Sequence, residues 1–334
     1  MKNPTDPRKE NQEAKNSEYL NTYSPRDKWW DGHRADTDAI SKIYTSNEIF
    51  KSKGIRMGAC TEVLKFGHIT NPQTGEVRIT LREAHFCKDR VCPVCQKRRG
   101  VLWRKRLLDK MPELQKEFPT MRWIFLTLTL KNCEIEELRQ TIQYMNKCWR
   151  NFVRRKDIKK ILLGHIRATE VTRANDGKAH PHFHCMLMVP NDFFKKKYIK
   201  QSEWAKMWKE CLGVDYTPIV DVRAIKNTKI DCELLNTTIA DELYQGVLET
   251  IKYSTKSKDL LIDEAWLLEF TNQVKNLRFI DTGGALKNVF KIEKETDKDL
   301  ALADTGGQAD DGTRIVFGWE RKEKKYKRKR DFDV

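Results

Sequence analysis

The chain has 334 residues, and its 64 lysines and arginines outnumber its 48 aspartates and glutamates, which gives a formal net charge of +16. This length can bury one large core or two modest ones, and the charge favours a polyanionic partner, with nucleic acid as the first candidate. The longest apolar stretch, 123–130, is too short to span a bilayer and the polar N-terminus lacks the apolar core of a secretion signal, so we expect a cytoplasmic protein with no membrane partner.

Residues 1–58 are predicted to form an N-terminal arm and a helix. Up to about residue 36 the sequence is polar and rich in Asn, Lys and Asp, so we expect a largely disordered arm with an anchor at Trp29-Trp30. A short helix is predicted from Asp38 to about Lys51.

The next predicted segment, 59–118, contains a hairpin and a basic helix. The hairpin strands cover 61–70 and 76–82, and the turn between them is Asn-Pro-Gln-Thr-Gly. A long helix is predicted from Val94 to Phe118. Basic residues crowd its start, so it is a candidate for binding DNA phosphates through Arg98, Arg99 and Arg104.

A cysteine cluster lies between this hairpin and the helix. The chain has nine cysteines, and because a cytoplasmic protein keeps its thiols reduced, we expect metal ligands among them rather than a disulfide framework. Cys92 and Cys95 share the two-residue gap of zinc knuckles, and Cys87 adds a third thiolate. If the hairpin folds about residues 73 and 74, Cys60 falls opposite Cys87 and completes a structural Zn²⁺ site.

Two alternatives for this cluster stay open: a redox dithiol, and plain core cysteines. If one thiolate is missing from the zinc site, His85 is the reserve ligand. The other cysteines have no shared spacing, and we interpret them as structural: Cys133, Cys148, Cys185, Cys211 and Cys232.

Strands and helices alternate from 119 to 260. Residues 123–130 form a strand too apolar for a sheet edge, and an amphipathic helix follows, with its apolar face at Leu138, Ile142, Met145, Trp149 and Phe152. Further helices are predicted at 201–211 and 240–256, and a strand within 218–225. With a hairpin at the centre, this order predicts an α+β fold with helices on one face of an antiparallel sheet.

That central hairpin carries three histidines at a spacing of two, His180, His182 and His184. On a strand this spacing points all three imidazoles from one face. If the hairpin folds about Asp176, Glu170 on the preceding strand lies opposite His182, and a carboxylate and two imidazoles converge on one ion. The alternative is a half-buried strand whose histidines are solvated or hydrogen-bonded.

Glu249 and Tyr253 stand four residues apart on a predicted helix and so share one face. This pair alone is weak evidence for catalysis, because many helices carry a tyrosine and a glutamate on a polar face.

The rest of the chain is predicted to form an extension at 261–292, an Asp- and Gly-rich linker at 293–313 and a basic tail at 314–334. The tail holds eight Lys or Arg against one Glu between Arg321 and Arg330. Such a block is usually solvated, but it can also bind phosphates.

Several of these motifs occur together in one family. The chain resembles the Rep-type replication initiators of small rolling-circle plasmids, which belong to the His-hydrophobe-His (HUH) endonuclease superfamily. The match runs from about Cys60 to Lys256, with weaker similarity through Gly283-Gly284 and 316–319. Its motifs, in chain order, are Cys60, 87–95 with Arg98-Arg99 and Trp103, 125–130, 170–172, 180–184 and 252–256.

The resemblance implies an HUH nuclease domain at 119–260, built on a five-stranded antiparallel sheet with packing helices. It implies a metal-dependent, site-specific endonuclease and transesterase that nicks and joins one DNA strand. His182, His184 and Glu170 would bind Mg²⁺ or Mn²⁺, with His180 as a further candidate.

The same resemblance assigns the catalytic residues. Tyr253 corresponds to the nucleophile that forms a 5′-phosphotyrosyl intermediate at the plasmid origin, and Glu249 to the general base of the terminating cut. Lys252 and Lys256 are candidates to hold the phosphate. The implied partners are origin DNA that is single-stranded at the nick site, a host helicase, a host DNA polymerase and a second copy of the chain in a homodimer.

Other functions stay open at this point. An HUH transposase or conjugative relaxase would share the metal site and the tyrosine. A non-catalytic zinc-dependent DNA-binding regulator would use the histidines structurally. It would change the electrophoretic mobility of a plasmid without cutting it. An RNA-processing metalloenzyme would cut RNA without forming an adduct.

Overall fold

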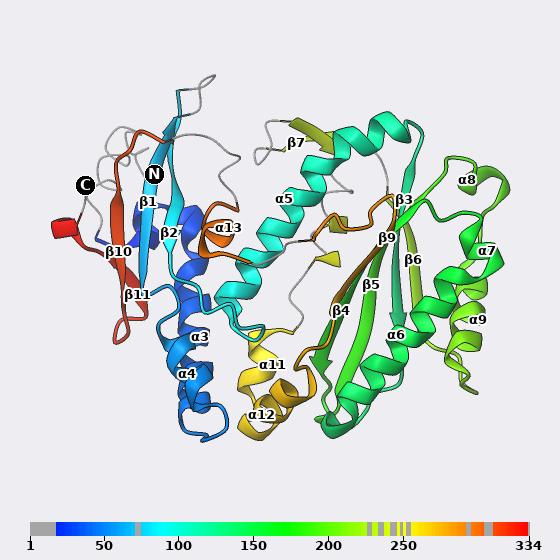
Figure 1. The fold of residues 1–334 in the computed structure, drawn as a ribbon, viewed down its shortest axis with the longest axis horizontal. Coiled ribbons are helices and arrows are strands. Elements are labelled where there is room, and N and C mark those ends of the chain that lie inside the picture. The colour runs from blue at the N-terminus through cyan, green and yellow to red at the C-terminus, as the bar shows by residue number, and fades with distance from the viewer. Residues whose placement is uncertain are drawn as a thin grey trace, which may run out of the picture. The chain divides into compact units, whose positions relative to one another are not determined.

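The computed structural model describes residues 18–70, 75–225, 229–232, 237–240, 246–247, 250–251, 255–291, 295–303 and 310–332. The chain divides into two compact units, one of Met1–Leu102 with Lys294–Val334 and one of Trp103–Glu293 (Figure 1). The predicted boundaries at 118 and 260 both fall inside the second unit. The segments expected to be an arm and a tail belong to the first, as does the expected linker from Lys294 onward.

The first unit is built on a four-stranded antiparallel sheet in the order β11-β10-β1-β2. The predicted hairpin forms β1 (Val63–Thr70) and β2 (Val77–Ala84). The segment expected to be a basic tail forms β10 (Ile315–Glu320) and β11 (Lys325–Arg328), and η3 (Arg330–Phe332) follows. Tyr326 is fully buried, so this tail is part of the sheet and not a solvated extension.

The helices of the first unit begin earlier than predicted. The structure has α2 (Leu20–Tyr23), η1 (Pro25–Asp27), α3 (Trp29–Thr45) and α4 (Lys51–Gly58). Over residues 18–36 the prediction of disorder is therefore wrong, and the helix predicted from Asp38 to about Lys51 instead begins at Trp29 and ends at Thr45. Residues 1–17 lie outside the described residues. The buried face of α3 contains Arg34 and Thr37 beside its apolar residues, and these polar side chains hide the helical period.

The segment expected to be a linker contains α13 (Asp297–Ala301). Thr296 and Asp299 form a reciprocal capping box at its start. Leu300 and Ala301 are buried, so residues 297–301 form a packed helix and not a solvated linker. The expected linker also includes 304–309, which lie outside the described residues.

The second unit is built on a five-stranded sheet in the order β6-β3-β5-β4-β9, and each neighbouring pair is antiparallel. Its predicted members occur in the expected places, and β3 is an interior strand as predicted. The strands are β3 (Arg122–Thr129), β4 (Gly164–Arg173), β5 (Ala179–Val189), β6 (Val220–Ile225) and β9 (Ile280–Gly284). The fold is therefore α+β with antiparallel sheets.

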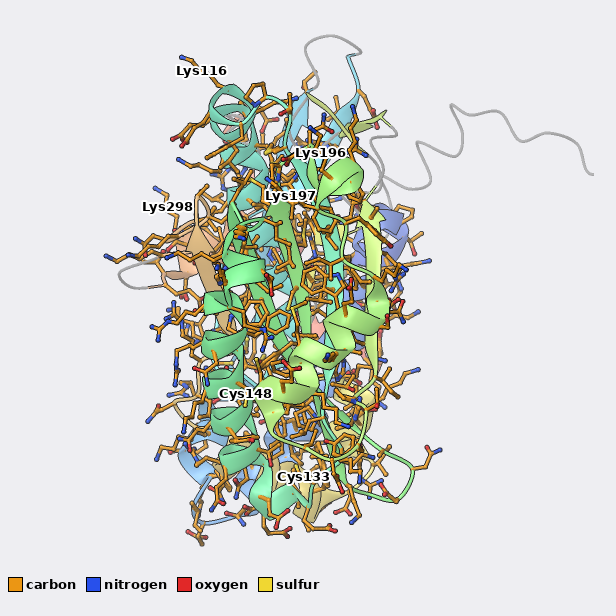
Figure 2. The ribbon with its side chains drawn as sticks, turned by 90° about the vertical axis from the view of Figure 1, so that its right-hand side faces the viewer. Lys116, Cys133, Cys148, Lys196, Lys197 and Lys298 are labelled. Carbon is orange, nitrogen blue, oxygen red and sulfur yellow. The ribbon has the colours of Figure 1, made fainter. Side chains whose placement is uncertain are left out.

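One face of this sheet is covered by α6 (Leu138–Arg154) and α9 (Gln201–Leu212). Figure 2 shows these two helices in front of the strands, with Cys148 on α6. Their aromatic residues pack on alternate residues of β5, such as Phe183 and Leu187. Short elements flank this layer: η2 (Ile135–Glu137), α7 (Lys156–Lys159) and α8 (Phe193–Lys196).

The opposite face is covered too, so the prediction of helices on one face is wrong. Leu107 and Met111 of α5 (Pro93–Glu117) pack there, together with Val247 and Ile251. The remaining described elements are α11 (Ser257–Leu261), α12 (Glu264–Gln273) and a two-stranded sheet of β7 (Lys229–Cys232) and β8 (Thr237–Ala240). Within the described ranges, every helix is too short or too polar to cross a bilayer.

Candidate active site and cysteine cluster

The histidine hairpin folds in the predicted register. Glu170 on β4 pairs with His182 on β5. On the other side of β5, Thr127 of β3 pairs with His184. Because alternate residues of a strand share a face, His182 and His184 lie on the same side of the sheet.

These side chains converge closely enough to hold a metal ion. The Nε2 atom of His184 lies 2.9 Å from Oε2 of Glu170, and Nε2 of His182 lies 3.4 Å from the same oxygen. Adjacent ligands of an octahedral ion at about 2.1 Å stand about 3.0 Å apart, so these spacings fit a divalent cation. All three residues are buried. A carboxylate with two imidazoles suits Mn²⁺ better than Mg²⁺, which prefers oxygen ligands.

The Nδ1 atoms of His182 and His184 also have neighbours that orient the two rings. Nδ1 of His182 donates to the carbonyl oxygen of His180 at 3.2 Å, and Nδ1 of His184 lies 3.5 Å from Oγ1 of Thr127. The Phe125 ring stacks on His184 with a centroid separation of 5.6 Å. These contacts direct both Nε2 atoms toward Glu170, as outer contacts do around metal-binding histidines.

The charge of Glu170 suits a cation. Burial raises the pKa of this carboxyl group, but hydrogen bonds from His182 and His184 outweigh it and hold the pKa well below its usual range. Glu170 is therefore ionised at neutral pH, in the form that binds metal.

His180 lies beside the triad rather than in it. Its Nδ1 is 2.7 Å from Oδ1 of Asn132, and its ring centroid is 5.0 Å from that of His182. Burial lowers the pKa of His180, and the neighbouring His182 lowers it further. It is thus neutral at pH 7 and hydrogen-bonded to an amide.

The predicted catalytic residues Tyr253 and Glu249, and also Lys252, lie outside the described residues. Val247 and Ile251 are described, and they are buried in the same cluster as Phe125 and Met186. Met186 is two residues from His184 on β5, so this cluster lies on the sheet face of the triad. Val247 and Ile251 therefore pack on that face.

Gly246 lies close to the edge strand of the sheet. A Cβ atom on Gly246 would lie 2.8 Å from Cδ1 of Ile225, on β6. Beyond position 253, Thr255 is buried and Lys256 is exposed.

The four predicted cysteines meet in the first unit. Sγ of Cys60 lies 3.8 Å from Sγ of Cys92 and 3.7 Å from that of Cys95, and the Cys87 and Cys95 sulfurs are 3.6 Å apart. Four thiolates around a tetrahedral Zn²⁺ at about 2.3 Å stand about 3.8 Å apart. The residues therefore fit a zinc ion.

Burial also favours a bound cation there. It raises the pKa of the Cys95 thiol well above its usual value, and the neighbouring sulfurs add to this effect. Hydrogen bonds from the neighbouring thiols outweigh burial at Cys92 and lower the pKa of that thiol well below its usual value. Metal binding would therefore release a proton from Cys95, while Cys92 offers a thiolate already. The hydroxyl of Thr37 lies 3.7 Å from Sγ of Cys92, a contact that the sequence did not indicate.

The reserve ligand His85 is not in this cluster. Its side chain is 58% exposed, and its Nδ1 lies 3.3 Å from a carboxylate oxygen of Asp297. Four of the cysteines interpreted as structural are free thiols outside the cluster, namely Cys133, Cys148, Cys185 and Cys211. The side chain of Cys232 is outside the described set.

Two predicted DNA-binding arginines bind within the protein instead. Arg98 is 1% exposed and donates to the carbonyl oxygens of Leu300 and Ala301. These carbonyls end α13, where unpaired oxygens attract a cation. Arg99 forms a two-pronged ion pair with Glu295. The Arg98 guanidinium is buried in these contacts. Arg99 is only partly buried, and its role in DNA binding stays a prediction.

The two remaining described candidates keep some exposure. Arg104 is partly exposed on α5, and Lys256 is exposed at the residue before α11. Their roles in DNA binding stay predictions.

Comparison with known proteins agrees with the motifs. The family model described as "Replication protein" matches residues 78–327. A protein named "Protein rep" from Bacillus amyloliquefaciens is 34% identical over 281 residues, which cover 78% of this chain and 81% of that protein. "Protein rep" from Streptococcus pneumoniae is 30% identical over 310 residues, covering 90% and 92%. No solved structure matches significantly. The chain therefore belongs to the replication protein (Rep) family, the rolling-circle plasmid replication initiators that its motifs resemble.

Proposed function

We propose that this protein binds the double-strand origin of a plasmid, nicks one strand through Tyr253, and later ends the round and rejoins that strand. The observation that carries the proposal is the convergence of Glu170, His182 and His184 on the sheet face against which Val247 and Ile251 pack. Membership of the Rep family supports the same function. The proposed domain is of the HUH type.

Tyr253 is proposed to attack the scissile phosphorus. A bond forms between its phenolic oxygen and phosphorus, the bond from phosphorus to the 3′ oxygen breaks, and the freed 3′-OH primes synthesis. A divalent ion held by the triad, Mn²⁺ or Mg²⁺, would stabilise the negative charge that develops on the phosphate. The 5′-phosphotyrosyl link keeps the bond energy, so rejoining needs no ATP.

Glu249 is proposed to end the cycle. Four residues before Tyr253 on a helix, its carboxylate would share the tyrosine's face and accept a proton from the water that makes the terminating cut. Hydrolysis at this step would release the strand instead of starting another round. Lys252 and Lys256 would steady the phosphate.

The cysteine cluster is proposed to hold a structural Zn²⁺. Cys60 precedes β1, and Cys87 follows β2. Cys92 is the residue before α5, and Cys95 lies in its first turn. One ion would therefore tie the base of the hairpin to the first turn of the long helix. The four thiolates leave no ligand position for a substrate, which suits a structural role.

The proposed activity requires origin DNA that is single-stranded at the nick. Unwinding and synthesis would come from a host helicase and a host DNA polymerase. A homodimer at the origin is a further proposal.

The test is incubation of the wild-type protein and of Tyr253→Phe with supercoiled plasmid that carries the cognate origin, in Mn²⁺. We expect the wild type to nick and to form a covalent protein–DNA adduct, and Tyr253→Phe to bind the origin without an adduct. Tyr244→Phe, a change at a nearby tyrosine, is the matched control and should behave as wild type. An adduct that persists in Tyr253→Phe would move the nucleophile elsewhere, and wild-type binding without any cut would favour a regulator.

A further inference from the structure

A basic groove lies in the second unit between α5 and the turn after β9. The turn runs beside α5 in Figure 1. The groove has a volume of about 380 Å³, with Arg106 and Lys110 on the α5 side and Lys287 and Asn288 on the turn. Among the described residues that line it, Asp109 is the acidic one, and its carboxylate already pairs with Lys105. The lining therefore has a net positive charge.

The turn that forms one wall is held firmly against β4. Gly284 has φ +59°, and a Cβ atom there would lie 2.2 Å from the carbonyl oxygen of Leu163, so the position requires glycine. The amide of Ala285 donates to the same carbonyl at 2.9 Å, and the amide of Lys287 donates to the carbonyl of Gly284 at 2.9 Å. Lys287 thus stands on a fixed backbone, which lowers the entropy lost when a ligand binds.

The α5 wall is joined to the turn at its edge. Nη1 of Arg106 donates to the carbonyl oxygen of Lys291 at 3.2 Å. The ring centroids of Trp103 and Phe290 are 6.1 Å apart. Lys110 pairs with Glu113 on the surface of α5. Such a surface ion pair is worth little, so a phosphate can replace the carboxylate.

The groove lies within reach of the triad on one side of the sheet. Leu286, in the turn, packs in the same cluster as Phe125 and Met186. Along β4, Gly164 beside the turn is six residues from Glu170, a span of about 20 Å at the usual rise per residue. About six stacked nucleotides of one strand cover that distance.

We propose that this groove binds the phosphate backbone of single-stranded DNA that flanks the cleaved phosphodiester. The proposal rests on the proposed function for its ligand. Arg106, Lys110 and Lys287 contact phosphates, and the grip is independent of base sequence because the lining offers cations rather than a pattern of base-reading groups.

The experiment measures binding of full-length protein to a fluorescent dT oligonucleotide of 15 nucleotides from 50 to 200 mM NaCl. No Mn²⁺ or Mg²⁺ is added, so that no cleavage occurs and the proposed zinc site keeps its metal. The test variant is Lys110→Gln/Lys287→Gln. The control is Lys159→Gln/Lys160→Gln, which removes the same charge from exposed lysines elsewhere in the second unit. A further variant, Arg106→Gln, checks the third cation, and thermal unfolding verifies that each variant is folded.

We expect the test variant to reduce the slope of log K against log salt concentration by about 1.4. It loses two phosphate contacts, and each contact with a single strand contributes about 0.7 to the slope. This corresponds to roughly 20-fold weaker binding at 100 mM NaCl, with little change in the control. Equal losses in the test and control variants, an unchanged slope, or no binding by the wild type at 50 mM NaCl would overturn the proposal. The result is separate from the adduct assay: a groove that binds DNA in a protein that forms no adduct would refute the proposed function alone.

Discussion

Glu170 pairs in register with His182, yet its carboxylate lies closer to His184, at 2.9 Å against 3.4 Å. The carboxylate therefore reaches diagonally across the hairpin and contacts both imidazoles. Diagonal neighbours of an antiparallel pair are within reach of long side chains, and here this reach brings three ligands to one point. The site depends on the register, because a shift of one residue would turn both histidines to the other face.

Replacing Glu170 with Gln should remove the anionic ligand and leave two imidazoles. We expect Mn²⁺ binding to weaken by at least about 100-fold and nicking to be lost. Loss of a residue that only contacts a metal ligand lowers metal affinity by about 10- to 100-fold, and a direct ligand contributes more. Isothermal titration with Mn²⁺ measures this change. Glu136→Gln, an exposed glutamate in η2, is the control, and equal Mn²⁺ affinity in the two variants would remove Glu170 from the site.

Thr127 should act on the metal through His184. Thr127→Val removes the hydroxyl that lies 3.5 Å from Nδ1, so we expect Mn²⁺ affinity to fall about 10-fold. Thr127→Ser keeps the hydroxyl and should restore most of the affinity. If the Thr127→Val and Thr127→Ser variants bind Mn²⁺ equally well, the hydroxyl does not position the His184 ring.

The cysteine cluster should contain one zinc ion per chain, measured by mass spectrometry of the metal content. Cys95→Ser should lose that zinc and unfold at a lower temperature, by roughly 10 °C or more if the metal contributes about 3 kcal/mol. Cys133→Ser, a thiol outside the cluster, is the control. A wild-type protein without bound zinc, purified under conditions that spare metals, would contradict the assignment.

Asp281 should make stability depend on acid pH. Burial raises its pKa, but His165, Arg167 and Trp149 outweigh this effect and lower the pKa to about 2. Because the folded value lies below the ordinary 3.8, the carboxylate stabilises the protein above about pH 4, and this contribution is lost as pH falls from 4 toward 2.

Asp281→Asn should therefore destabilise the second unit at pH 7 by about 1 kcal/mol, after allowance for partial solvent screening. Urea unfolding at pH 7 and at pH 2.5 measures the difference between variant and wild type. The difference should shrink at the lower pH, and one that is equal at both would show that the ionised carboxylate is not its source.

The histidine hairpin could be predicted from the sequence because its signals are local. The spacing of His182 and His184 fixes their common face, and the turn chemistry fixes the position of Glu170 opposite them. The cysteine cluster could be predicted for the same reason, because Cys60 and Cys87 flank one hairpin. The zinc and Mn²⁺ assignments stay proposals that the metal-content and titration experiments test.

Features set by distant contacts could not be predicted. The pairing of β10 with β1 joins residues about 250 positions apart, and the basic residues around Tyr326 hide its buried alternation. Arg98 resembled a surface cation, but it binds the carbonyls that end α13. The second layer of helices depends on α5 and on Val247 and Ile251, and no local pattern says which face of the sheet a helix covers.

The central claim is tested most directly by identifying the residue that carries the DNA. The wild-type protein is trapped on a cognate origin in Mn²⁺, digested with nuclease and protease, and examined by tandem mass spectrometry. The account predicts a nucleotide joined through a 5′ phosphate to Tyr253, and no such peptide when His184 is replaced by Ala. A nucleotide on another residue, or an adduct that forms equally without His184, would contradict it.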